Sequence, residues 1–222
     1  MGDLPDIIYV VRPGEINDAL RFSLRSLGNL PHRRVIVAGH CPSWVRNVVK
    51  VPVRKLPNKL NAIEANLRAA LRDPDLTERA IYFNDDFYVM EPIDEVPVTH
   101  GGPVSEFTLR QEFRWRMNRT IDEFVRQGMR VQFQGMVAYD GVHMPLPVET
   151  EVVRQVLGAM PSGVLWRTWY GNVCAIGGDR VANTKSKNGD VIEGPFMSTN
   201  STSLRPLRTY LDDVLPKESP YV

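Results

Sequence analysis

The sequence of 222 residues contains only two cysteines, Cys41 and Cys174, and they are far apart. It has no Cys-x-x-Cys pair and no His-Glu-x-x-His spacing. Neither a zinc site nor a disulfide framework is therefore expected. We interpret both thiols as reduced structural residues.

Long hydrophobic runs are also missing. The longest uninterrupted apolar run covers residues 7–11, whereas a membrane-spanning helix needs about 20 residues. The first six residues have neither the basic segment and apolar stretch of a signal peptide nor a myristoylation signal. We expect a soluble, cytoplasmic protein with no membrane partner.

The chain has no excess of charge of either sign. Its 27 Lys and Arg against 26 Asp and Glu leave a formal charge of +1. This balance predicts no large basic surface for nucleic acid or acidic lipid. The hydrophobic fraction of 43% excludes a disordered or collagen-like chain.

Short apolar strands alternate with amphipathic helices in the first ninety residues. We predict strands over residues 7–11, 34–38, 48–53 and 80–83. Between them, apolar residues recur at helical spacing, first at Ile16, Leu20, Leu24 and Leu27, then at Leu60, Ile63, Leu67 and Leu71. Parallel strands need crossover helices, so the pattern predicts an α/β fold with a Rossmann-like, mainly parallel sheet flanked by helices.

Beyond Pro92 the pattern becomes irregular. We predict short helices over residues 120–127 and 149–157, and a β-like segment over residues 139–145. A last amphipathic helix is marked by Leu204, Leu207, Leu211 and Leu215.

The tetrapeptide Asn84-Asp85-Asp86-Phe87 follows the fourth predicted strand. Open α/β sheets bind ligands at the carboxyl ends of their strands. Carboxylate oxygens suit Mg²⁺ or Mn²⁺, which can bridge the oxygens of a diphosphate. Asp85 and Asp86 are therefore candidate metal ligands, with an ordinary solvated turn as the alternative.

Other nucleotide and hydrolase motifs are absent from the sequence. There is no Gly-x-x-x-x-Gly-Lys-Ser/Thr loop and no Gly-x-Gly-x-x-Gly after the first strand. A Gly-x-Ser-x-Gly nucleophile elbow is missing too. A P-loop kinase, an NAD enzyme and an α/β-hydrolase are therefore unsupported.

Several short blocks carry a resemblance when they are taken together. They are Arg12-Pro13-Gly14, residues 20–27, 41–45, 83–87, His143-Met144-Pro145, and residues 167–172, 196–199 and 219–221. In this order they resemble small glycosyltransferases encoded by actinobacteriophages. They are more distantly similar to the Stealth family of sugar-phosphate transferases.

The resemblance implies a GT-A-type fold in one domain, residues 1–222. Residues 1–92 would form the nucleotide-sugar-binding half, and residues 93–222 the irregular acceptor-side half with the C-terminal helix. It implies a nucleotide-sugar donor, with a UDP-sugar as the favoured class, and Mn²⁺ or Mg²⁺ as cofactor. The acceptor would be a hydroxyl on a glycan or protein, such as a phage capsid or tail protein.

By this resemblance, Asp85 and Asp86 correspond to an Asp-x-Asp metal motif. Asn84 stands where many such motifs have their first Asp, so the metal could rest on Asp86 alone. Asn84 and Asp85 are also placed among the donor-binding residues.

Four further residues are candidates for donor binding. Arg12 and Gly14 follow the first strand, where an arginine can reach a base or phosphate. Lys59 and Asn61 stand at the start of the second helix, where backbone N–H groups and an ammonium could meet a diphosphate. An Arg in a surface turn and a solvated Lys remain the alternatives.

The catalytic candidates come from the second half of the chain. His143 matches the His of the Stealth His-x-Pro element, and with Asp140 nearby it could act as base toward the acceptor hydroxyl or as a metal ligand. Arg167 matches the family's arginine near the phosphates. A structural role for His143 remains open, and Trp169 and Tyr170 are interpreted as core.

Arginines are frequent between Arg110 and Arg130, around Phe113 and Trp115. Because acidic residues dilute their charge, we favour a solvated helical face, with contact to an anionic ligand or to nucleic acid as weaker alternatives.

We therefore expect a glycosyltransferase with no nucleic-acid partner. Stealth-like transfer of a sugar 1-phosphate is the alternative within enzymes. A catalytically inactive glycan- or nucleotide-binding module is the alternative of another class.

Overall fold

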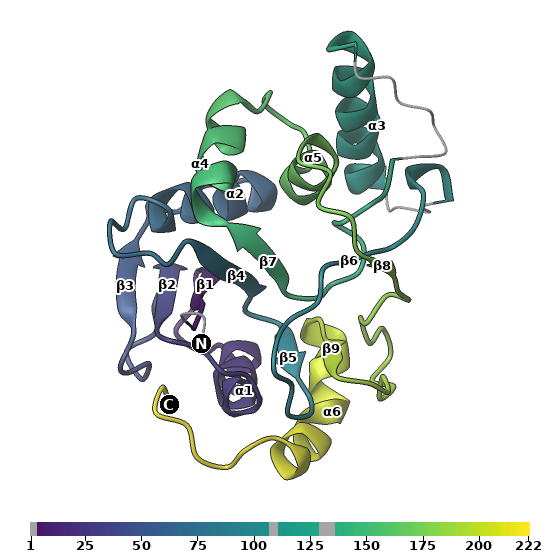
Figure 1. The fold of residues 1–222 in the computed structure, drawn as a ribbon. Helices are drawn as coiled ribbons and strands as arrows, with labels where there is room; N and C mark the ends of the chain where they lie inside the picture. Colours follow the sequence, from purple (N-terminus) through teal and green to yellow (C-terminus); the bar gives the residue numbers. More distant parts are fainter. Residues whose placement is uncertain (1–3, 107–110, 129–135) are drawn as a thin grey trace. The chain divides into compact units, whose positions relative to one another are not determined.

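The computed structural model describes residues 4–106, 111–128 and 136–222 (Figure 1). The chain divides into two compact units. Unit 1 consists of Met1–Val96, His143–Glu151 and Thr184–Val222, and unit 2 of Pro97–Val142 and Val152–Asn183.

Unit 1 is built on a five-stranded sheet with the order β3-β2-β1-β4-β7. Its strands are β1 (Asp6–Val11), β2 (Val35–Gly39), β3 (Val49–Pro52), β4 (Arg79–Asn84) and β7 (Leu146–Glu149). The first four are parallel, and β7 runs antiparallel to β4. All six residues of β1 are buried, as expected for a central strand covered on both faces. The predicted mixed α/β fold with a mostly parallel sheet is confirmed.

The two helices of the crossover connections cover opposite faces of this sheet (Figure 1). The helix α1 (Asp18–Ser26) lies between β1 and β2 in the chain, and α2 (Lys59–Ala70) between β3 and β4. Both were predicted, but the proposed start of the first apolar stripe is wrong. Ile16 is 88% exposed because it precedes Asn17, whose side chain accepts a hydrogen bond from the Leu20 N–H and begins the helix.

The face of α1 that points away from the sheet joins a second apolar cluster. It packs with a small antiparallel ladder, β5 (Phe87–Val89) and β9 (Phe196–Ser198), and with the C-terminal helix α6 (Ser201–Val214). The four leucines predicted for the C-terminal helix all lie in this cluster, although Leu215 directly follows the end of α6. The cluster contains Ala19, Phe22, Tyr88, Met197, Leu204, Leu207, Leu211 and Leu215. A 3₁₀ turn, η1 (Leu27–Asn29), follows α1.

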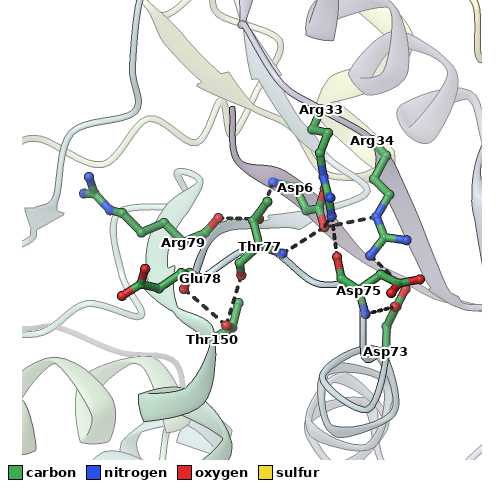
Figure 2. Close-up of polar contacts among 9 residues, drawn as sticks. All are labelled: Asp6, Arg33, Arg34, Asp73, Asp75, Thr77, Glu78, Arg79 and Thr150. Carbon is green, nitrogen blue, oxygen red and sulfur yellow. Dashed lines mark hydrogen bonds and ion pairs between the residues drawn. The ribbon is translucent and has the colours of Figure 1, made fainter. Parts of the chain in front are cut away.

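A buried carboxylate ties the amino ends of the central strands together (Figure 2). Asp6 is fully buried and accepts two hydrogen bonds from Arg33, at 2.8 and 2.7 Å, and one from Arg34 at 3.1 Å. The Thr77 N–H donates to it at 3.2 Å. Burial alone would raise the pKa of Asp6, but these hydrogen bonds outweigh it and hold the pKa below its ordinary value.

Unit 2 is mainly helical. Its helices are the 3₁₀ turn η2 (Val104–Glu106), α3 (Gln111–Arg126) and α5 (Trp166–Val173), and its strands are the two-residue β6 (Thr99–His100) and β8 (Asp179–Arg180). The helix α4 (Thr150–Ala159) begins in unit 1 and continues into unit 2. The helix predicted over residues 120–127 is the second half of α3. The rings of Phe124 and Trp169 stack at 4.5 Å, which confirms Trp169 as a core residue, and Tyr170 is buried as well.

The β-like segment predicted over residues 139–145 is wrong. The chain forms turns there, and His143 has a φ of +51°, a left-handed conformation that no strand contains. The strand β7 begins only at Leu146, after the turns. In the described part of the chain, no helix is long and apolar enough to cross a membrane.

Candidate functional site

The order of the strands places a candidate site between β1 and β4. From β1 the chain moves outward to β2 and β3, and then returns to pair β4 with the other side of β1. In open α/β sheets, the carboxyl ends of the two strands at such a reversal flank a crevice that binds ligands. Arg12 directly follows β1, and Asp85 directly follows β4.

Arg12 and Asp85 form an ion pair across these two strand ends. The Arg12 Nε lies 3.0 Å from Oδ2 of Asp85, and the Asn17 amide donates to the same oxygen at 2.8 Å. Asp85 is buried, whereas the Arg12 side chain is 48% exposed. A partly exposed cation is thus paired with a buried carboxylate. Asn17 was not predicted, although its place before an amphipathic helix is typical of an N-cap.

Two carboxylates, those of Asp85 and Asp86, are adjacent at this point. Burial raises the pKa of Asp85, and the neighbouring charge of Asp86 raises it further. Arg12, Asn17 and Lys59 act in the opposite direction. The ionised form of Asp85 thus depends on the cations around it.

Lys185 supplies a second cation, which no motif predicted. Its Nζ lies 3.3 Å from Oδ2 of Asp86, and the two side chains are only 20% and 14% exposed. The two residues are separated by 99 positions in the chain. We call Arg12, Asn17, Asp85, Asp86 and Lys185 the strand-end cluster.

The other predicted donor-binding residues lie in unit 1. Lys59 is the exposed first residue of α2 and acts electrostatically on Asp85. The backbone N–H of Asn61 donates to the capping side chain of Asn58 at 3.1 Å. The side-chain oxygen of Asn84 accepts a hydrogen bond from the Tyr82 hydroxyl at 2.6 Å, so this oxygen is engaged within the protein. Gly14 has a φ of +152°, a conformation that glycine adopts readily.

His143 belongs to unit 1, and its backbone contacts the residue that precedes Lys185 of the strand-end cluster. Its carbonyl accepts a hydrogen bond from the Thr184 hydroxyl at 2.9 Å, and Thr184 precedes Lys185. This contact fixes the backbone of His143. The role of its imidazole stays a prediction.

Asp140 and Arg167 belong to unit 2, where they interact with each other. The Thr168 N–H donates to Oδ2 of Asp140 at 2.8 Å. Burial raises the pKa of Asp140, and the charge of the buried Arg167 partly offsets this effect, as does Arg116. The three predicted catalytic residues are thus divided, with His143 in unit 1 and the Asp140–Arg167 pair in unit 2.

The arginine-rich stretch is only partly the solvated face that we predicted. Arg116 is 7% exposed, so it belongs to the interior of unit 2. Arg119 donates to the Ser162 carbonyl at 2.6 Å, and Arg126 pairs with Glu123 at 2.7 Å. Arg110 and Arg130 lie outside the described residues.

The strand-end cluster fits a divalent metal poorly. Magnesium usually takes one or two carboxylates together with waters and substrate phosphates, but here each carboxylate already faces a cationic side chain. Across residues 4–106, 111–128 and 136–222, no three His, Cys, Asp or Glu side chains form a group that could hold a metal ion. Metal dependence stays a prediction.

Compared by sequence with protein-family models and with curated proteins, the chain matches none. The geometry of unit 1 and the sequence motifs are therefore what indicates a function.

Proposed function

We propose that the protein is a glycosyltransferase that uses a nucleotide-sugar donor, with a UDP-sugar as the favoured class. The observation that carries the proposal is the ion pair of Arg12 and Asp85 across the ends of β1 and β4. The pair lies where open α/β sheets bind nucleotides, and the side chain of Arg12 is 48% exposed.

In this reaction an acceptor hydroxyl attacks the anomeric carbon of the donor. The new carbon–oxygen bond forms as the bond to the diphosphate breaks, and the hydroxyl proton passes to a base, for which His143 is the candidate. Negative charge develops on the departing nucleoside diphosphate. Arg12, Lys59 and Lys185 are cations of unit 1 that can stabilise it, and the resemblance adds Arg167.

The donor is identified by measuring nucleotide release from UDP-, GDP- and TDP-sugars, with and without Mg²⁺ or Mn²⁺. Slow hydrolysis of one donor, reduced in Arg12→Ala, is the expected result. Binding of a donor without any turnover would favour an inactive binding module. Absence of both release and binding across the panel would contradict the proposal.

Mass spectrometry of the product separates the two transfer reactions. A glycosyltransferase leaves the diphosphate on the nucleotide, so its product gains only the sugar. Stealth-like transfer moves the sugar with one phosphate. A glycan or protein acceptor, including a phage capsid or tail protein, is tested by the same measurement.

A further inference from the structure

Backbone hydrogen bonds of unit 1 bring Lys185 close to Asp86. Lys185 forms a parallel bridge with Ser198, and hydrogen bonds of 2.8 and 3.0 Å flank it, from the Ser186 N–H to the Ser198 carbonyl and from the Ser198 N–H to the Thr184 carbonyl. The strand β9, which contains Ser198, pairs with β5 directly after Asp86. The backbone at Lys185 and the backbone next to Asp86 thus belong to one hydrogen-bonded array, which places the two side chains within reach of each other.

The charges of the strand-end cluster are balanced without a metal. Asp85 and Asp86 contribute two carboxylates, and Arg12 and Lys185 contribute two cations at 3.0 and 3.3 Å from them. A divalent cation at Asp86 would have to displace Lys185 or lie beside its positive charge. Both arrangements are unfavourable, because the low exposure of the pair limits screening by water.

We propose that Lys185 takes the place of a divalent cation at Asp86, so that the strand-end cluster binds the diphosphate of its ligand without metal. The inference deepens the proposed function, and its second part rests on that function. Lys185 would then have two effects: it keeps metal away from Asp86, and it contributes a positive charge to the bound diphosphate.

The first effect is tested on the protein alone, by titrating it with Mn²⁺ and following the free ion by electron paramagnetic resonance. We expect no Mn²⁺ site in the wild type. The variant Lys185→Gln should gain a Mn²⁺ site, with an affinity at least about tenfold above any residual binding to the wild type, because it uncovers Asp86. Adding Asp86→Asn should abolish the gain. Lys187→Gln, an exposed lysine two positions away, is the matched control and should behave as the wild type.

A stoichiometric Mn²⁺ site in the wild type would overturn the inference, even if every variant failed to fold. Lys185→Arg keeps the positive charge and should exclude Mn²⁺ as the wild type does. Circular dichroism and thermal melting establish that each variant is folded.

The second effect is tested by calorimetric titration with UDP, GDP and TDP in the presence of EDTA. The expected result is that one of them binds without metal, and that Lys185→Gln weakens this binding about tenfold. Added Mn²⁺ should restore binding to Lys185→Gln and leave the wild type unchanged. Binding to the wild type only in the presence of metal would overturn the inference while leaving the proposed function intact.

If no nucleotide bound under any condition, the proposed function would fail. The Mn²⁺ titration, which contains no nucleotide, would still decide whether Lys185 excludes metal from Asp86.

Discussion

The guanidinium of Arg12 lies 3.0 Å from the buried carboxylate of Asp85 and joins the ends of two neighbouring parallel strands. Removing one partner of such a pair leaves a buried charge without compensation. Because Arg12 is half exposed, water replaces part of the lost interaction.

We therefore expect Arg12→Ala to lower the free energy of unfolding by about 1 kcal/mol at neutral pH. Burial and the charge of Asp86 raise the pKa of Asp85, so acidification neutralises this carboxyl at a higher pH than an ordinary aspartate, and the difference from the wild type should fade as the pH falls through that raised pKa. Urea unfolding at several pH values measures it. The exposed Arg72→Ala is the control, and an equal loss in both variants would contradict the role of the pair.

Asp6→Asn should destabilise the protein by about 2 kcal/mol, since it weakens the charge-assisted hydrogen bonds from Arg33 and Arg34. The pKa of Asp6 is lowered on folding, so its contribution is present above the ordinary aspartate value of 3.8 and is lost as the pH falls below it. The free energies of unfolding of the variant and the wild type should thus approach each other as the pH falls below 3.8. A difference in the free energy of unfolding that does not change with pH would show that the charge of Asp6 does not stabilise the protein.

Arg25 connects α1 to the end of α6. This buried guanidinium donates to the Pro216 carbonyl at 2.7 Å, to the Leu215 carbonyl at 3.1 Å and to the carboxylate of Asp212 at 2.5 Å. Arg25→Ala removes the donors from the carboxyl end of α6, and we expect a loss of about 2 kcal/mol in denaturant unfolding. Arg208→Ala, which breaks an exposed ion pair with Asp18, should cost much less.

Gly39 of β2 lies directly against Asn66 of α2. An added Cβ there would overlap the Val11 carbonyl and the side chain of Asn66, and the φ of +108° already disfavours other residues. We expect Gly39→Ala to cost more than about 3 kcal/mol, by overpacking and strain together. Gly194→Ala, at a φ of +110° but with open space around it, isolates the cost of strain alone. Similar melting temperatures for the two variants would contradict this account.

His143 lies in a left-handed turn, which complicates its replacement by alanine. Asparagine tolerates that conformation, so His143→Asn removes the imidazole with little strain. If His143 is the base, kcat should fall about 100-fold while the melting temperature stays nearly unchanged. Unchanged kcat would assign His143 a structural role only.

The sequence pattern was sufficient for most of unit 1. The central strands are short, apolar and β-branched, and the leucines of α1, α2 and α6 repeat at helical spacing, so local periodicity and burial agree. The pattern failed where the local spacing of residues and the conformation in the folded protein disagree. Ile16 has the right spacing but stands outside the helix, and the turn at His143 has a conformation that its sequence does not reveal.

The candidate site was half predictable. Arg12 and Asp85 could be found because each directly follows a recognisable strand. Lys185 could not, because it reaches Asp86 through the bridge to Ser198 and not through any local motif. Backbone pairing between segments this far apart has no local sequence signal, so a single sequence does not predict it.

The division of the chain has a consequence for the order in which the protein forms during synthesis. Unit 1 contains the first strand of the chain, yet its apolar cluster around α1 needs Met197 and the leucines of α6. All segments of unit 2 are translated by residue 183. A growing chain can thus complete unit 2 first. Unit 1 is completed last although its first strand is translated before unit 2, in contrast to the usual N-terminal-first order.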